Sequence, residues 1–383
     1  MLLCVFAFKF SLVLKTRAKT RLLYYLFDLE SPTMKQIQIA ERYLPFSHRP
    51  GIRCLIPFSF YGLQIFPTHL KFFDMHHYPS PQIGEVELQH CGPIKEFIVT
   101  LDLERGRVTV AGKNRDGYFR YHIALVEDKL SFCLEKGNIS LDCRNISLNI
   151  LPADKKSLLS RNLSSLERLS LGGHRKQEEE LIRRRGKMED ILPLWHRLGL
   201  LLPEIAPAPY SGVASFLTQV GEGTPNDFLD PFRLIWETGF DGLFFPTLED
   251  QLHQGIGYPP FDTKSALSPL SLLTAATDLI RSLFVQSSGK EISILPHLPR
   301  EFHCGRMTSI EFQSGNLSIE WSKKEIRRHF FTPKESGEYH FSYPHVKTFR
   351  LRKSKKEFGK RLDVKEILTL EAGAKYSFDN FES

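Results

Sequence analysis

The stretch of sequence that decides the fold is Phe97-Ile98-Val99-Thr100-Leu101-Asp102-Leu103-Glu104-Arg105-Gly106-Arg107-Val108-Thr109-Val110. Its apolar residues fall at every second position from 97 to 103, which is the period of a half-buried β-strand. Residues 104–107 then provide a turn, and the alternation resumes at Val108 and Val110. Two alternating segments joined by a short turn predict an antiparallel hairpin.

The same pattern continues toward residue 150. Residues 114–117 read Asn-Arg-Asp-Gly, a turn in which Asn and Gly tolerate positive φ. Alternating apolar residues follow in three further segments, at Phe119, Tyr121 and Ile123, at Leu130, Phe132 and Leu134, and at Ile139, Leu141 and Cys143. Upstream, the proline-rich residues 41–93 favour short strands and loops over long helices. Strands at intervals of about ten residues predict an antiparallel β-sandwich over 34–152.

The hydrophobic period changes after Pro152. Residues 155–170 and 176–202 are rich in helix formers, and residues 227–238 predict another helix. The clearest helix is 268–286, where Ser268 is a favourable N-cap and Pro269 suits the first helical position. We therefore expect a helical region over 153–288.

Strand patterns return in 289–383, with a hairpin predicted around the turn Ser314-Gly315-Asn316. The expected fold class is α+β, with an N-terminal antiparallel β-sandwich, a helical middle and a small C-terminal β-sandwich. Residues 1–33 precede a second possible start at Met34, and we interpret them as a non-native extension or a disordered tail. The alternative is a weak, atypical signal or anchor. The sequence does not decide between Met1 and Met34 as the true start.

Composition excludes several function classes. The net charge of +7 is spread along the chain without zinc-finger or RNA-binding motifs, so no nucleic-acid partner is expected. No segment reaches about 18 uninterrupted apolar residues, so no membrane span is expected. Six cysteines without CxxC spacing indicate reduced thiols in a cytoplasmic protein. No motif indicates a cofactor or a metal, and the oligomeric state is left open.

The segment Gly289-Lys290-Glu291-Ile292-Ser293-Ile294-Leu295-Pro296-His297-Leu298-Pro299 resembles one in inverting α-L-fucosidases and their relatives with six-hairpin helical barrels. In that family it follows the last barrel helix and leads through a Gly into a small β-domain with a Trp. Here Gly305, Gly315 and Trp321 stand at comparable places. The resemblance is strongest over roughly 258–321, and it implies a partial helical barrel and a glycoside-hydrolase-like function. Residues 101–108 are also similar to a hairpin in the family's β-sandwich.

The resemblance also implies that the catalytic machinery is incomplete. In the family, Pro-Pro-Phe precedes the catalytic base, an Asp three residues after the Phe. This chain has Pro259-Pro260-Phe261, but Lys264 occupies the position of the base. A cation cannot accept a proton from the attacking water, and no residue matches the family's proton donor. We therefore expect a degenerate relative with a carbohydrate-binding or structural role.

Carboxylates and aromatic residues are interleaved between 227 and 262. Such a mixture suits sugars, because rings stack on apolar sugar faces and carboxylates accept hydrogen bonds from hydroxyls. The candidate carbohydrate-binding residues are Asp227, Asp230, Trp236, Asp241, Tyr258 and Phe261. One alternative is an active hydrolase in which Glu237 is the acid and Asp262 the base. The other is a protein-interaction scaffold, in which these residues only cap helices and fill the core.

Overall fold

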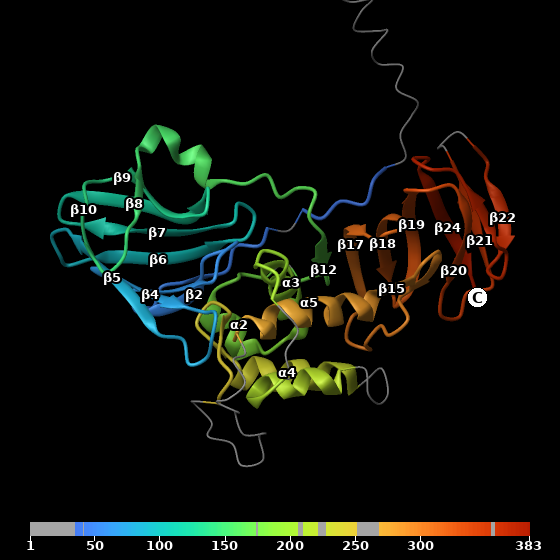
Figure 1. Ribbon diagram of the computed structural model, residues 1–383. Helices are drawn as coiled ribbons and strands as arrows, with labels where there is room; N and C mark the ends of the chain where they lie inside the picture. The colour runs from blue at the N-terminus through green and yellow to red at the C-terminus, as the bar shows by residue number, and fades with distance from the viewer. Residues whose placement is uncertain are drawn as a thin grey trace, which may run out of the picture.

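The computed structural model describes residues 35–40, 42–173, 175–205, 210–220, 227–250, 268–353 and 357–383. In these residues the chain contains both strands and helices, and the strands predominate, in agreement with the expected α+β class. β-sheets form the two ends of the molecule, and the α-helices lie between and below them (Figure 1). The expected extension 1–33, together with Met34, lies outside the described residues.

Two sheets form the N-terminal part. The first contains, in spatial order, β1 (Phe46–Ser47), β6 (Lys95–Asp102), β7 (Arg107–Asn114), β8 (Gly117–Val126), β9 (Lys129–Lys136) and β11 (Asn149–Leu151). The second contains β10 (Ser140–Arg144), β5 (Gln82–Gln89), β4 (His69–Asp74), β3 (Tyr61–Ile65) and β2 (Ile52–Leu55). All the pairs are antiparallel except that of β11 with β9. Apolar side chains of both sheets belong to one hydrophobic core.

The hairpins predicted from the alternating pattern are confirmed. Val99 pairs with Val110, and Val110 pairs with Tyr121 on the next strand. All three are completely buried, so the predicted apolar positions do face the core. The turn between β7 and β8 uses Gly117 at a φ of 120°, a conformation that side chains with a Cβ rarely adopt.

In the described part of residues 153–288, fewer residues are helical than the sequence predicts. The helices are η1 (Ala153–Leu159), α2 (Glu179–Arg185), α3 (Met188–Gly199), η2 (Gly212–Gln219), η3 (Asp227–Leu229), α4 (Asp230–Thr238) and α5 (Ser271–Phe284), where η marks 3-10 helices. A short ribbon of β13 (Phe240–Asp241) and β14 (Phe245–Pro246) follows α4.

Two helix predictions need correction. The helix expected over 155–170 is wrong beyond residue 159, because residues 168–170 form strand β12 (Arg168–Ser170), which pairs with the C-terminal sheet. The helix expected over 176–202 is two helices, separated where Gly186 adopts a φ of 58° and closes α2. The helix expected at 268–286 is present as α5, but it begins at Ser271. Ser268 accepts a hydrogen bond from the Leu270 amide in the preceding turn.

The C-terminal part again contains two sheets. The larger one contains β12, β17 (Cys304–Glu311), β18 (Gly315–Ser322), β19 (Glu325–Pro333), β24 (Tyr376–Glu382), β21 (Thr348–Arg352) and β22 (Lys360–Asp363). The smaller one contains β15 (Val285–Ser288), β16 (Glu291–Ile294), β20 (Gly337–Ser342) and β23 (Leu368–Leu370). The hairpin predicted around residues 314–316 is confirmed as β17 and β18.

Helices α3 and α5 pack together at the centre of the molecule. The Trp195 indole of α3 is completely buried and donates a hydrogen bond to the Leu272 carbonyl of α5, at 2.9 Å. The ring also makes edge-to-face contacts with Phe232 and Phe240. Through these contacts α3 fixes the position of α5 and connects it to α4.

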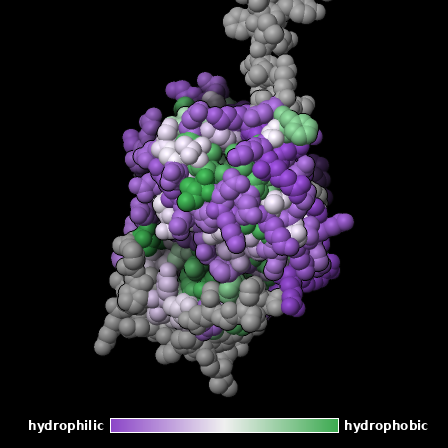
Figure 2. Space-filling model, turned by 90° about the vertical axis from the view of Figure 1, so that its right-hand side faces the viewer, coloured by the Kyte–Doolittle hydropathy of each residue, from purple (hydrophilic) through white to green (hydrophobic). Residues whose placement is uncertain are grey.

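One face of the molecule, that of the C-terminal sheets, is mostly hydrophilic (Figure 2). Seen from the side of the C-terminal sheets, polar residues cover most of the face, with a smaller apolar area among them (Figure 2). Among the described helices, none is long and apolar enough to cross a membrane.

Candidate functional site

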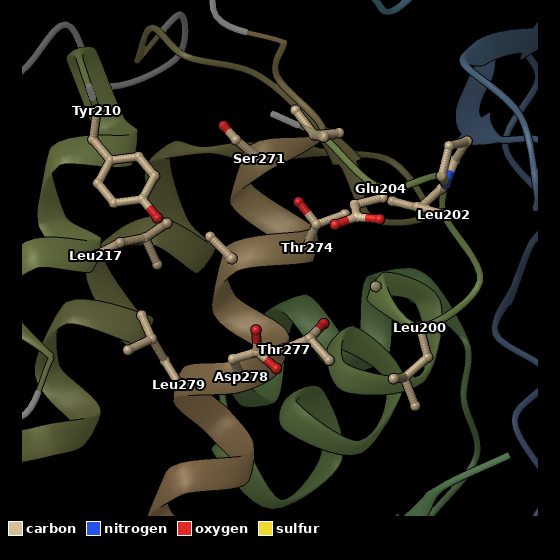
Figure 3. Close-up of a pocket in the computed structure, with 14 residues that line it drawn as sticks. Leu200, Leu202, Glu204, Tyr210, Leu217, Ser271, Thr274, Thr277, Asp278 and Leu279 are labelled. Atoms are coloured by element: carbon tan, nitrogen blue, oxygen red, sulfur yellow. The ribbon is translucent and has the colours of Figure 1, made fainter. Parts of the chain in front are cut away.

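A pocket of about 760 Å³ opens between α3 and the outer face of α5 (Figure 3). We call it the α3–α5 pocket. It is lined by the end of α3, the segment that follows α3, η2 and α5. The lining residues are Gly199, Leu200, Leu202, Pro203, Glu204, Ile205, Tyr210, Leu217, Ser271, Thr274, Ala275, Thr277, Asp278 and Leu279. Gly199 lets the two helices meet here, because a Cβ at this position would collide with the Thr277 hydroxyl and the Leu273 carbonyl.

Hydroxyl side chains line the α5 side of the pocket. Ser271, Thr274 and Asp278 are separated by three and four residues, a spacing that places them on one face of the helix. The Thr274 hydroxyl donates back to the Leu270 carbonyl at 3.3 Å, as Thr277 does to Leu273 at 2.8 Å. The half-buried Thr274 hydroxyl thereby keeps its lone pairs available to accept a hydrogen bond from a ligand, whereas Thr277 is buried against Gly199.

Ser271 differs from the two threonines. The residue is only 5% exposed, and its Oγ has no hydrogen-bond partner among the described residues. Leaving a buried hydroxyl unpaired is unfavourable, and such groups in native structures call for an explanation.

Two carboxylates, Glu204 and Asp278, also line the pocket, and both are exposed. Figure 3 shows Tyr210 and Glu204 on opposite sides of the pocket, with Asp278 further along α5. Burial raises the pKa of the Tyr210 phenol, and the negative charge of Asp278 raises it further. Among the described residues that line the pocket, none is a Lys, an Arg or a His.

The residues proposed from the sequence lie elsewhere. Glu237 is exposed on α4, and Asp230, at the start of α4, forms an ion pair with Arg233 at 2.7 Å. Asp241 lies 3.5 Å from Arg49 and 3.8 Å from Arg53. None of these three carboxylates lines the α3–α5 pocket. The pocket therefore contains none of the three proposed carboxylates whose side chains the structure describes.

The proposed aromatic residues are only partly described. Trp236 is 3% exposed, and its ring packs against Phe240 and Phe244 and beneath the Arg183 guanidinium. This ring contributes to the core. Tyr258, Phe261, Asp262 and Lys264 lie outside the described residues, as does the side chain of Asp227, which opens η3.

A second polar cluster lies on the first N-terminal sheet. His122 is 2% exposed, with one ring nitrogen 3.0 Å from the Thr109 hydroxyl and the other 3.0 Å from Glu135. Lys156 of η1 and then His122 lower the pKa of Glu135 to about 2, while burial lowers the pKa of His122. Because both ring nitrogens are already hydrogen-bonded, this cluster fits a structural link between the sheet and η1.

Glu204, Tyr210, Ser271 and Asp278 were not predicted from the sequence as site residues. One local signal was present, since Ser271, Thr274 and Asp278 form a polar stripe beside the apolar stripe of that helix. Glu204 and Tyr210 gave no such signal, because they lie outside regular secondary structure.

Within the described residues, no three His, Cys, Asp or Glu side chains group closely enough to hold a metal ion. No protein-family model matches this chain, and no curated protein shows significant sequence similarity to it. The chemistry of the α3–α5 pocket is therefore the basis on which a function can be proposed.

Proposed function

We propose that this chain is a glycoside-hydrolase-like protein that binds carbohydrate in the α3–α5 pocket without hydrolysing it. The observation that carries the proposal is the lining of the pocket, with two carboxylates, the Thr274 hydroxyl and one exposed tyrosine. Carboxylates and hydroxyls match the hydrogen-bonding groups of a sugar, and the Tyr210 ring offers a surface on which a sugar face can stack. Ligand sites commonly combine apolar walls with a few polar groups in this way.

The exposure of the carboxylates supports binding over catalysis. An acid catalyst for glycoside hydrolysis must keep its proton near neutral pH, and enzymes achieve this by burying the carboxyl in an apolar environment. Glu204 and Asp278 are both exposed. The presence of Lys264 where the resemblance expects the catalytic base supports the same proposal.

The division of the chain into three domains of named architecture is part of this proposal. Under it, 34–152 is a β-sandwich domain, 153–288 a partial helical barrel and 289–383 a small C-terminal β-sandwich domain. Two sheets with a shared core at the N-terminal end are compatible with the first of these. A cytoplasmic location, inferred from the sparse cysteines, also remains a prediction.

A glycan array with the full-length chain tests the proposal, followed by product analysis of any bound glycan after long incubation. We expect binding without turnover, and at least about a tenfold loss of affinity in Glu204→Gln or Asp278→Asn, the scale of one lost charged hydrogen bond. Glu237→Gln is the matched control, because Glu237 is an exposed helical carboxylate away from the pocket.

The alternative outcomes separate the candidate functions. Loss of binding in Glu237→Gln but not in Asp278→Asn would move the site to the residues first proposed from the sequence. Turnover that Asp262→Asn abolishes would make the protein an active hydrolase. Failure to bind any glycan would contradict the proposal and favour the interaction scaffold.

A further inference from the structure

A smaller pocket lies where the β13–β14 ribbon packs against the second N-terminal sheet. Its volume is about 180 Å³, and its walls come from β2, β4, the segment 78–80 and residues 245–247. At about 30 Å³ for each water molecule, this space holds about six waters, which is room for one monosaccharide. Among the described residues that line it, Arg53 alone carries a charge, and we call it the Arg53 pocket.

Contacts on two sides fix the position of Arg53. The Leu243 amide donates a hydrogen bond to the Arg53 carbonyl at 2.8 Å, and a Cβ at Gly242 would lie only 2.4 Å from the same oxygen. The guanidinium lies over the rings of Phe73 and Phe245, at 5.8 and 5.6 Å from their centroids. These two rings meet edge to face at 6.3 Å. The ribbon and the two rings therefore hold the guanidinium in place before a ligand binds.

The guanidinium of Arg53 has N–H groups available for an anion. Its side chain is 32% exposed and donates no hydrogen bond to a described residue, since the Asp241 carboxylate lies 3.8 Å away. Asp241 also pairs with Arg49, at 3.5 Å. Two guanidinium groups therefore share one carboxylate, which leaves one positive charge uncompensated. Because guanidinium N–H groups match the two oxygens of a carboxylate, a carboxylate is the ligand group that this site favours.

Hydroxyl groups and apolar walls indicate the rest of the ligand. The Tyr78 hydroxyl donates to Glu249 at 3.2 Å, which links the segment 78–80 to the residues that follow β14. The half-buried Ser80 donates its proton to the His77 carbonyl at 3.2 Å, so its oxygen can accept a hydrogen bond from a ligand hydroxyl. The prolines and phenylalanines of the lining offer apolar surface to the C–H face of a ring. A sugar-sized ring that carries both hydroxyls and a carboxylate is a uronic acid.

We propose that the Arg53 pocket binds one uronic acid residue of a glycan, with its carboxylate on the Arg53 guanidinium and a ring hydroxyl at Ser80. This site is separate from the α3–α5 pocket, so the inference does not depend on the proposed function. It also gives a new role to Asp241, which the sequence suggested as a carbohydrate-binding residue. The Asp241 carboxylate competes with the ligand for Arg53 instead of binding the sugar.

Ligand-observed NMR titration of the full-length chain with methyl glucuronide and its uncharged amide tests this inference. At pH 7 and low salt we expect methyl glucuronide to bind about tenfold more tightly than the amide, the scale of one charged hydrogen bond. Arg53→Met should remove this preference. Arg53→Lys keeps the charge but not the paired N–H groups, so it should retain only part of the preference.

Arg49→Met is the matched control, because Arg49 contacts the same carboxylate as Arg53 but does not line the pocket. It should leave the preference unchanged to within about twofold, the scale of one exposed charge pair. Asp241→Asn is a second variant, which leaves the guanidinium intact. It should raise the affinity for methyl glucuronide about twofold, because a competing negative charge is removed.

Several results would overturn this inference. Equal affinity for methyl glucuronide and its amide, or a preference that survives Arg53→Met, would show that Arg53 does not bind the carboxylate. A fall in affinity in Asp241→Asn would show that Asp241 binds the sugar. Tighter binding of benzoate than of methyl glucuronide would show that the pocket recognises aromatic acids and not sugars. The proposed function is tested separately, because its readout is glycan binding that depends on Asp278 and not on Arg53.

Discussion

Arg197 of α3 offers the sharpest test of how the parts of the molecule are held together. The residue is 1% exposed, and its guanidinium donates hydrogen bonds to the carbonyls of Leu163 at 3.0 Å, Glu167 at 3.1 Å and Leu103 at 3.4 Å. Leu103 follows β6 in the N-terminal part, while the other two acceptors lie in the segment that leads to β12. The guanidinium also lies over the buried Tyr43 ring. One side chain therefore connects α3 with two distant segments.

We expect Arg197→Met to destabilise the protein by about 3 kcal/mol. Methionine retains most of the aliphatic volume but cannot donate a hydrogen bond. The two shorter bonds contribute roughly 1.5–3 kcal/mol each because their donor is charged. Removing a buried cation recovers part of its desolvation cost, which offsets some of this loss. The expected loss is a large part of a typical unfolding free energy of about 5–15 kcal/mol.

Urea unfolding monitored by tryptophan fluorescence measures this change, because Trp195 lies on the same helix and is completely buried. Arg233→Met is the matched control. Arg233 is also a helical arginine, but it is partly exposed and pairs with exposed Asp230 and Glu301. Surface pairs contribute about 0–1 kcal/mol, so the control should lose little. A loss below about 1 kcal/mol for Arg197→Met, or equal losses in the two variants, would refute the assignment of Arg197 as a central link.

Three further predictions follow from local geometry. Gly242→Ala should lower the free energy of unfolding by at least about 2 kcal/mol, because the new Cβ would collide with a backbone carbonyl of β2. Gly186 has a similar φ but open space around it, so Gly186→Ala should lower the free energy of unfolding by only about 1 kcal/mol. His329→Phe should cost about 1–3 kcal/mol by leaving the buried Tyr343 hydroxyl unpaired, and adding Tyr343→Phe should recover much of that loss in urea unfolding. Because the pKa of Glu135 is lowered from 4.5 to about 2, its interactions stabilise the folded state above pH 4.5 and are lost as the pH falls toward 2. We therefore expect the free energy of unfolding of Glu135→Gln to fall less between pH 5 and pH 3 than that of the unmodified chain, when both are measured by urea titration.

The sequence allowed the N-terminal hairpins to be predicted because their signals are local. The alternation of apolar and polar residues around Val99, Val110 and Tyr121 directly indicates a buried sheet face. The segments between them contain residues that favour turns. Strand β12 could not be predicted in this way. Its three residues follow a segment rich in helix formers, and only pairing with β17 makes them a strand. The partner lies more than a hundred residues later, so no local pattern indicates it.

The candidate site was harder to predict for a related reason. The sequence favoured a region where carboxylates and aromatic residues are dense, but density along the chain does not place side chains around one cavity. Asp230 and Asp241 pair with nearby arginines, and Trp236 is buried. The pocket instead combines residues around positions 204, 210 and 271–279, which become neighbours because α3 packs against α5.

The two faces of helix α5 have different roles: one packs into the core, and the other lines the proposed binding pocket. Its apolar face, with Leu272, Leu273 and Ile280 completely buried, packs into the core and positions the helix. Its polar face presents Thr274 and Asp278 to the pocket and contributes little buried apolar area. Substitutions on the polar face should therefore change ligand affinity with less than about 1 kcal/mol of change in stability, as is usual for exposed positions. Because the backbone that carries these side chains is fixed by the opposite face, a loss of binding in Asp278→Asn can be attributed to the carboxylate itself.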